Sequence, residues 1–202
     1  MHLVAHAIGI SWGGFNKFGL ERPAEVNVAS PYSGERLMFL HYFSDANLDT
    51  SSTSGGIAML AGGCILAVSQ NQHLAAPCTH TAETVSAGTN VNLLVPIAGL
   101  LQEFSILQGA LVPFYLDSDT TVKVGKSDSA IKKSVWLIRC AAVLEDCVVH
   151  KMIEIIHLTE RDMAADPYTK YLTYGVWARH MHYVLNLPGP LPSYPKSVEG
   201  GC

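Results

Sequence analysis

Short apolar runs separated by small and polar residues predict strands in the first half of this chain. Residues 36–43 are rich in β-prone side chains and are followed by a Ser-Asp pair. Residues 56–61 and 64–69 are two apolar runs joined by Gly62-Gly63, a pair typical of a two-residue hairpin turn. We therefore expect one strand followed by a β-hairpin.

The pattern then alternates between helical and extended segments. A helix is predicted to begin near residues 79–81, with Glu83 in its first turn. Pro96 should break or kink this helix because proline lacks the N–H donor and clashes with the preceding turn, which leaves residues 100–107 as a second helical piece.

Later elements follow from the same periodicities. The pattern predicts a strand at 112–116, a helix capped by Asp119, a helix at 131–144, a buried strand at 151–158 and a final helix at 166–185. Strands, helix, strand, helix, strand, helix is an α/β order with an antiparallel start and parallel crossovers. We expect a lead-in segment at 1–36, one domain at 37–187 and a Pro/Gly-rich tail at 188–202.

Composition narrows the class of protein. Apolar residues make up 49% and charged residues 15% of the 202 residues, which excludes a disordered chain. The formal net charge of -4 disfavours a general nucleic-acid binder, which carries a basic face, so a nucleic-acid role would require a local site or metal ions. The five cysteines contain no Cys-x-x-Cys pair, and their odd number argues against a disulfide framework.

Targeting signals are also informative. The longest apolar runs, 57–68 and 91–101, are interrupted by Gly, Asn or Pro and are too short for a membrane span. The N-terminus lacks the basic start and apolar stretch of a signal peptide. We expect an intracellular protein of the cytoplasm or nucleus, with an organelle as an open alternative.

Four acidic residues lie where elements begin or end. Asp45 follows a strand, Glu83 lies early in a helix, Asp117 ends a strand and Asp166 opens the last helix. Carboxylates that converge raise one another's pKa, but divalent cations among their oxygens make such a cluster favourable. Two such ions about 3.5–4 Å apart can activate a water and stabilise the leaving oxygen of a phosphodiester.

Five short segments, in order from Phe43 to Leu172, resemble motifs in the ribonuclease H region of copia-type retrotransposon polyproteins. They are Phe43-Ser44-Asp45-Ala46, Ser52-Thr53-Ser54-Gly55, Thr81-Ala82-Glu83-Thr84, Tyr115-Leu116-Asp117-Ser118 and Ala165-Asp166-Pro167-Tyr168-Thr169-Lys170-Tyr171-Leu172.

This resemblance implies both a fold and a reaction. The fold is α/β and ribonuclease-H-like, with a mixed five-stranded sheet (strands 1-2-3 antiparallel, 4 and 5 parallel) and helices on both faces. The reaction is cleavage of the RNA strand of an RNA–DNA hybrid with Mg²⁺ or Mn²⁺. By the resemblance, Asp45, Glu83, Asp117 and Asp166 are both the catalytic residues and the ligands of a two-metal site.

Basic residues of the family are missing at several places. Gln70, Asn71 and the pair Ala98-Gly99 stand where the family has basic side chains. Each lost phosphate contact weakens nucleic-acid affinity. The remaining basic candidates are Lys123, Lys126, Lys132, Lys133 and Lys170. An alternative is therefore a domesticated, catalytically weak or inactive domain that serves as a structural subunit, with proteins as its partners.

Overall fold

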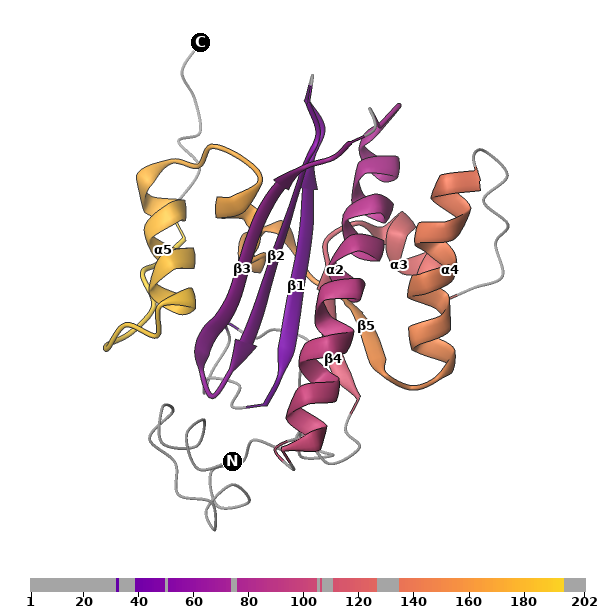
Figure 1. Ribbon diagram of the computed structural model, residues 1–202. Helices are drawn as coiled ribbons and strands as arrows, with labels where there is room; N and C mark the ends of the chain where they lie inside the picture. The colour runs from indigo at the N-terminus through magenta and orange to yellow at the C-terminus, as the bar shows by residue number, and fades with distance from the viewer. Residues whose placement is uncertain are drawn as a thin grey trace.

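The computed structural model describes residues 32, 39–49, 51–73, 76–104, 106, 111–126 and 135–194 (Figure 1). Its strands are β1 (His41–Asn47), β2 (Thr53–Leu60), β3 (Gly63–Asn71), β4 (Val112–Leu116) and β5 (Ile153–His157). Its α-helices are α2 (Thr79–Glu103), α3 (Asp119–Lys126), α4 (Val135–Val149) and α5 (Tyr174–Val184), and two 3-10 turns are η2 (Glu160–Asp162) and η3 (Asp166–Tyr168).

The strands form one five-stranded sheet in the order β3-β2-β1-β4-β5. The first three strands pair antiparallel, whereas β4 pairs parallel with both β1 and β5. Helices α2, α3 and α4 lie on one face, and η3 and α5 lie on the other (Figure 1). This arrangement confirms the predicted mixed sheet with helices on both faces.

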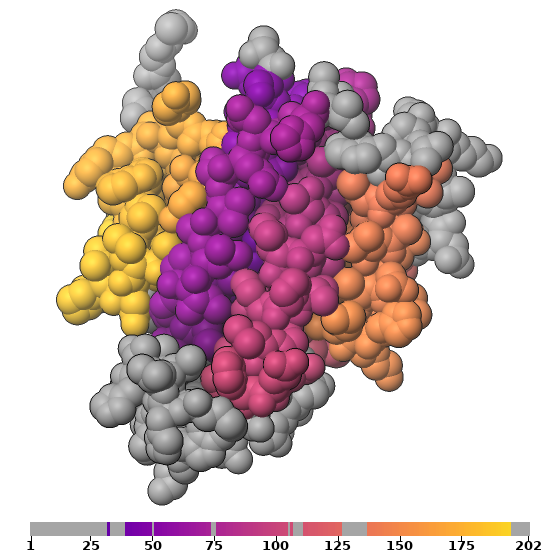
Figure 2. Space-filling model, in the orientation of Figure 1, coloured from indigo at the N-terminus to yellow at the C-terminus, as the bar shows by residue number. Residues whose placement is uncertain are grey.

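Alternation along β1 divides the core between the two faces, because successive strand side chains point in opposite directions. Tyr42 belongs to the cluster that packs under α2, with Val91 and Leu94. Phe43 belongs to the cluster on the other face, with Tyr183 of α5. β3 is one of the two edge strands, with β5 at the other edge, and it lies at the surface between α5 and α2 (Figure 2).

The helix predicted to break at Pro96 is instead continuous over 25 residues. Pro96 and Asn92, whose carbonyl loses its helical donor, are both exposed, so water can replace the missing N–H. Leu94 and Leu101 are buried on either side and hold the two halves in line. Among the described residues, α2 alone has the length and hydropathy of a membrane span, but 56% of that stretch is buried within the fold.

The hairpin turn is displaced by one residue from the prediction. Ala61 (φ 54°) and Gly62 (φ 75°) form the turn, and Gly63 is the first residue of β3. Two positive φ angles are what a two-residue turn requires to follow the strand twist, and glycine meets this at no steric cost. The predicted glycine pair therefore supplies one turn residue and one strand residue.

Several predicted boundaries near the acidic residues were wrong. β1 runs from His41 to Asn47, so Asp45 lies within this strand rather than after it. Glu83 lies in the second turn of α2 because the helix starts at Thr79. The helix predicted at 131–144 is observed from Val135 to Val149, with 131–134 outside the described residues.

Two further predictions concerned helix starts. Ser118, not Asp119, caps α3, since its Oγ accepts a hydrogen bond from the Thr121 N–H at 3.3 Å. The final helix is two elements: Asp166 opens the 3-10 turn η3, and α5 begins only at Tyr174.

The predicted domain limits at 37 and 187 stay predictions, since most of the lead-in and residues 195–202 lie outside the described residues. Tyr32 is buried and stacks on Tyr183 with ring centroids 4.2 Å apart. At the other end, the Pro192 carbonyl accepts a hydrogen bond from Arg179 at 2.8 Å. Both flanks thus touch α5.

Candidate metal centre

The point where β1 and β4 stop pairing positions two of the acidic residues. Parallel pairing is recorded at Tyr42–Phe114 and Phe43–Tyr115. Asp45 and Asp117 each lie two residues beyond the last pair, toward the carboxyl ends of neighbouring strands. β1 continues into β2 on one side, whereas β4 leads to β5 on the other. Ligand sites in α/β sheets favour such a point of divergence.

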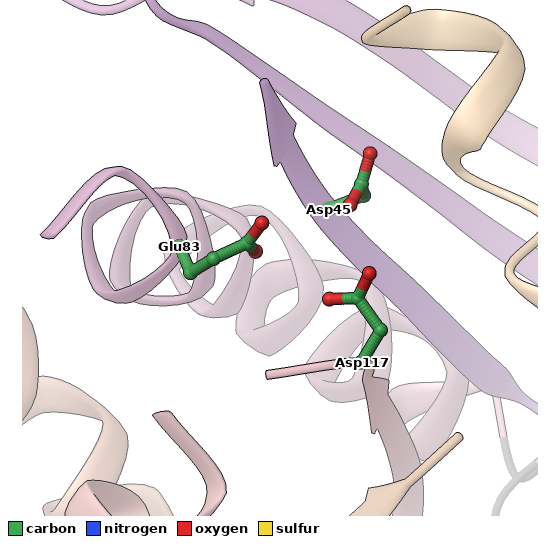
Figure 3. A group of neighbouring side chains, drawn as sticks. All are labelled: Asp45, Glu83 and Asp117. Carbon is green, nitrogen blue, oxygen red and sulfur yellow. The ribbon is translucent and has the colours of Figure 1, made fainter. Parts of the chain in front are cut away.

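A third acid joins them from α2. One carboxylate oxygen from each of Asp45, Glu83 and Asp117 lies within 4.8 Å of the other two. Figure 3 shows the three side chains directed toward one another from β1, α2 and the end of β4. Asp45 and Glu83 are buried and Asp117 is half-buried. The three residues form what we call the acidic trio.

Burial and mutual repulsion make the trio electrostatically costly without a cation. Burial raises the pKa of Glu83, and the nearby Asp45 and Asp117 carboxylates raise it further. Burial also raises the pKa of Asp45, an effect that Lys170 opposes. Among the described residues, Asp45 Oδ1 and Glu83 Oε2 are buried without a hydrogen-bond donor.

These features suit a divalent metal ion. Unpaired buried acceptors of like charge are unfavourable, and a cation among them supplies both missing contacts and opposite charge. An all-carboxylate donor set is the kind that Mg²⁺ and Mn²⁺ prefer over softer metals. The residues present therefore fit the expected ion.

The fourth predicted acid, Asp166, lies outside the trio but close to Asp45. Lys170 Nζ lies 3.1 Å from Asp166 Oδ1 and 3.9 Å from Asp45 Oδ2. Thr169 Oγ1 donates a hydrogen bond to Asp45 Oδ2. The structure thus brings three of the predicted acids together and places the fourth across a lysine ammonium from Asp45.

A buried hydrogen-bond network behind the trio was not predicted from the sequence. Asn90 Nδ2 lies 2.8 Å from Ser44 Oγ, 2.9 Å from the Gly55 carbonyl and 3.1 Å from Ser86 Oγ. Ser86 Oγ donates to the Asp45 carbonyl at 2.6 Å. The network ties α2 to β1 and β2 at the level of Asp45.

This network controls how Glu83 meets Asp45. Ser86 follows Glu83 by three residues, about one helical turn, so a bond that holds Ser86 against Asp45 also sets the reach of Glu83. The sequence signal was available: Ser86 and Asn90 are polar residues four apart on a largely apolar helix, which places them on one face.

Two consecutive glycines in β2 permit close approach on both faces of the sheet. A Cβ at Gly55 would lie 2.5 Å from Thr169 Cγ2, and one at Gly56 would overlap Asn90 Oδ1. Adjacent glycines inside a strand indicate such approach. Gly55 therefore lets Thr169 reach Asp45.

The basic candidates are scattered. Lys123 and Lys126 are exposed on α3, and Lys170 lies at the acidic residues. Lys132 and Lys133 lie outside the described residues.

Neither a protein-family model nor a curated protein sequence matches this chain. Solved ribonuclease H structures do match. A ribonuclease H1 isolated from compost by a metagenomic approach is 13% identical, with 64% of this chain and 91% of that chain covered and a TM-score of 0.50. An N-terminal ribonuclease H domain from Mycobacterium tuberculosis is 14% identical over 64% of this chain and 89% of that chain, with a TM-score of 0.47. Ribonuclease H1 from Halobacterium salinarum is 10% identical over 63% and 91%, with a TM-score of 0.46.

The similarity to the compost enzyme and the order and directions of the five strands agree with each other. The chain therefore has a ribonuclease-H-like fold.

Proposed function

We propose that this chain is a divalent-metal nuclease, derived from a copia-type element, that cleaves the RNA strand of RNA–DNA hybrids. The observation that carries the proposal is the acidic trio, whose three carboxylate oxygens lie within 4.8 Å of one another. The trio lies beside the end of the β1–β4 pairing, where the two strands lead to different neighbours, a position that ligand sites of α/β sheets favour.

The residues have distinct roles in this proposal. Asp45, Glu83 and Asp117 would hold one ion, and Asp45 with Asp166 would hold a second. Bound divalent ions lower the pKa of water and stabilise charge on the phosphodiester oxygens. Thr169 orients one Asp45 oxygen by its hydrogen bond, and the Ser86–Asn90 network keeps Glu83 in register with Asp45.

The copia-type origin is supported by the order of the five motif segments and by the contacts between them. Gly55 of the second segment faces Thr169 of the fifth, and Thr169 contacts Asp45 of the first. Segments that are far apart in the chain thus contribute to one site, as expected if they were inherited together.

Affinity for a hybrid should be modest. Exposed lysines are few, and the net charge of -4 opposes approach of a polyphosphate. Weak binding that falls further with salt is therefore expected, with cleavage measurable at high enzyme concentration.

A direct assay tests the proposal. The purified chain is incubated with an end-labelled RNA–DNA hybrid and either Mg²⁺, Mn²⁺ or EDTA. We expect cleavage of the RNA strand with the metals alone, leaving a 3′-hydroxyl and a 5′-phosphate. Asp45→Asn should lower the rate at least about 10³-fold, because it removes an anionic ligand common to both ions.

The matched control is Asp146→Asn, which alters an exposed aspartate on α4. It should cleave at the wild-type rate. Absence of cleavage by folded wild-type protein at high concentration, with either metal, would reject the proposal.

A second candidate function is that of a structural subunit with protein partners. Exposed apolar side chains gather around α5: Tyr171 is 108% exposed, Tyr174 82% and Leu185 58%. Exposed apolar side chains on one element can contribute to a protein interface. Under this alternative, Asp45→Asn should leave assembly unchanged, whereas Tyr174→Ser combined with Leu185→Ser should release the partner on gentle purification.

A further inference from the structure

Lys170 is a half-buried cation inside the acidic site rather than a surface lysine. Its side chain is 26% exposed, and Nζ lies 3.1 Å from Asp166 Oδ1 and 3.9 Å from Asp45 Oδ2. Asp45 and Asp166 are themselves 1% and 3% exposed as side chains. The ammonium therefore lies within ion-pair distance of two buried carboxylates.

The local backbone holds Lys170 at this position. Lys170 follows Asp166 by four residues, and its backbone N–H donates to the Asp166 carbonyl at 3.1 Å. The Thr169 N–H donates to the same carbonyl at 3.1 Å. Because these two hydrogen bonds fix the turn, the ammonium is held beside Asp166 at a high effective concentration, unlike a metal ion that must bind from solution.

We propose that the Lys170 ammonium occupies the second cation position, between Asp45 and Asp166, so that the resting protein binds one divalent ion, at the acidic trio. The inference rests on the proposed function, because it assumes that the trio binds a metal. It changes the expectation from two bound metal ions to one ion and one lysine.

Charge and distance both support this assignment. A divalent ion contacts a carboxylate oxygen at about 2.0–2.6 Å, so an ion between Asp45 and Asp166 would lie against the ammonium and be repelled by it. Asp45 Oδ1, Glu83 Oε2 and Asp166 Oδ1 are all buried without a hydrogen bond of good geometry, but the Lys170 ammonium lies 3.1 Å from Asp166 Oδ1 and supplies a positive charge there. The position between Asp45 and Asp166 therefore already has a cation, the Lys170 ammonium, whereas the acidic trio has none among the described residues.

Glu160 is a second ionic partner for Lys170, and it lies nearer to solvent. Its Oε1 lies 3.6 Å from Lys170 Nζ, and its side chain is 73% exposed on η2. Lys170 can turn toward Glu160, or toward the phosphate of a bound nucleic acid, without losing an ionic partner. A second divalent ion would then enter only when the ammonium has moved.

Manganese binding to the intact chain tests the inference without any assay of cleavage. Mn²⁺ is titrated by calorimetry, and the bound ions are counted by native mass spectrometry, for wild type, Lys170→Met and Lys170→Arg. We expect one bound Mn²⁺ for wild type, two for Lys170→Met, and one for Lys170→Arg, because the guanidinium keeps the charge. Lys123→Met, which alters an exposed lysine on α3, is the matched control and should bind one.

A second measurement covers the case in which Lys170→Met does not fold. In manganese-soaked crystals of wild type, anomalous scattering should show one peak at the trio and none between Asp45 and Asp166. Two peaks in wild type, or one ion in folded Lys170→Met, would overturn the inference and leave the proposed nuclease intact. If wild type bound no manganese, both the inference about Lys170 and the proposed metal-dependent nuclease would be rejected. Absence of cleavage together with one bound ion would remove the nuclease proposal alone.

Discussion

His41 and Asp45 point to the same face of β1, and each belongs to a buried polar region. The two regions differ in the groups they bury: neutral hydrogen-bonding groups in one and carboxylates of like charge in the other. One is the acidic trio around Asp45. The other, which we call the His–Tyr cluster, consists of His41, Tyr183, Tyr32 and His180. His41 and Asp45 are four residues apart on this strand and are both fully buried.

In the His–Tyr cluster, neutral donors and acceptors bond to one another, and among the described residues only His180 Nε2 of this cluster is buried without a partner. His41 Nδ1 lies 2.9 Å from the Phe39 carbonyl, and its Nε2 lies 3.0 Å from the Tyr183 hydroxyl. The first contact requires a proton on Nδ1, so Nε2 accepts from Tyr183. His180 Nδ1 lies 3.0 Å from the Tyr32 hydroxyl. Burial of matched neutral groups needs no external ion.

The trio instead buries acceptors of like charge, and its pKa values move the other way. Burial lowers the pKa of His41 and of His180 to about 4, so both are neutral near pH 7. Burial raises the pKa of Asp166 as well as those of Asp45 and Glu83. The neutral cluster can therefore be buried without a charged ligand, whereas burial of the trio costs stability unless a cation is bound.

The largest expected effect is loss of stability in acid through the His–Tyr cluster. Below pH 6.5 the unfolded histidines bind protons while the folded ones, with a pKa of about 4, do not. The contribution of the histidines to stability therefore falls as pH drops from 6.5 to 4, by up to about 3 kcal/mol for each histidine. The raised pKa values of Asp45 and Glu83 act in the opposite direction on metal-free protein, so the effect is measured by urea unfolding as a difference: wild type should lose stability relative to His41→Gln across this range. An unchanged slope in His41→Gln would refute the assignment of the loss to His41.

Divalent metal ions should stabilise the folded protein by binding at the trio, not at the His–Tyr cluster. At about 100 times Kd, Mg²⁺ or Mn²⁺ should add about 2.7 kcal/mol to the free energy of unfolding of wild type. Asp45→Asn should lose most of this gain. Tyr183→Phe, in the other region, should keep it, as measured by melting temperature with and without metal. Equal metal responses in Asp45→Asn and wild type would contradict the site.

Replacing one acid by an amide should stabilise the metal-free trio. Glu83→Gln should raise the free energy of unfolding at pH 8 by about 1–2 kcal/mol, since folding no longer has to protonate a carboxyl group whose pKa burial raises to about 10. The raised pKa values set the sign: the unfolded acids release protons above pH 4 and the folded ones release them later, so metal-free stability falls as pH rises.

Tyr183→Phe is the contrasting change, and it should lower stability by about 1–2 kcal/mol because it leaves His41 Nε2 unpaired. Stabilisation by both substitutions, or destabilisation by both, would remove the difference between the two regions.

The smallest effect is expected from a substitution in the hydrogen-bond network of Ser86 and Asn90, which lies behind the trio. Ser86→Ala removes the 2.6 Å bond to the Asp45 carbonyl and should cost about 1 kcal/mol of stability. Because Ser86 sets the reach of Glu83, manganese affinity should also fall by a few fold. Ser69→Ala, which removes a bond from an exposed serine to the Tyr168 carbonyl, is the comparison and should leave that affinity unchanged.

Much of the architecture was predictable because it depends on local patterns. Alternation and apolar runs located β2, β3 and β4, and the motif order predicted the mixed sheet. The error at Pro96 has a tertiary cause, since burial of Leu94 and Leu101 keeps α2 continuous where local propensity favours a break. Likewise, Asp166 lies on a 3-10 turn rather than on the last helix, because the following residues pack against Asp45 and Gly55.

The sequence alone was enough to nominate the four acids, through the motif segments that resemble the copia-type family, and to predict the order of the elements, because motifs, spacing and alternation can be read along the chain. It could not show that three acids share one position while the fourth faces a lysine. That outcome depends on contacts such as the one between Thr169 and Asp45, which are 124 residues apart. Such pairs meet only after the sheet has formed and η3 has packed against Gly55, and their geometry is set by packing rather than by sequence spacing.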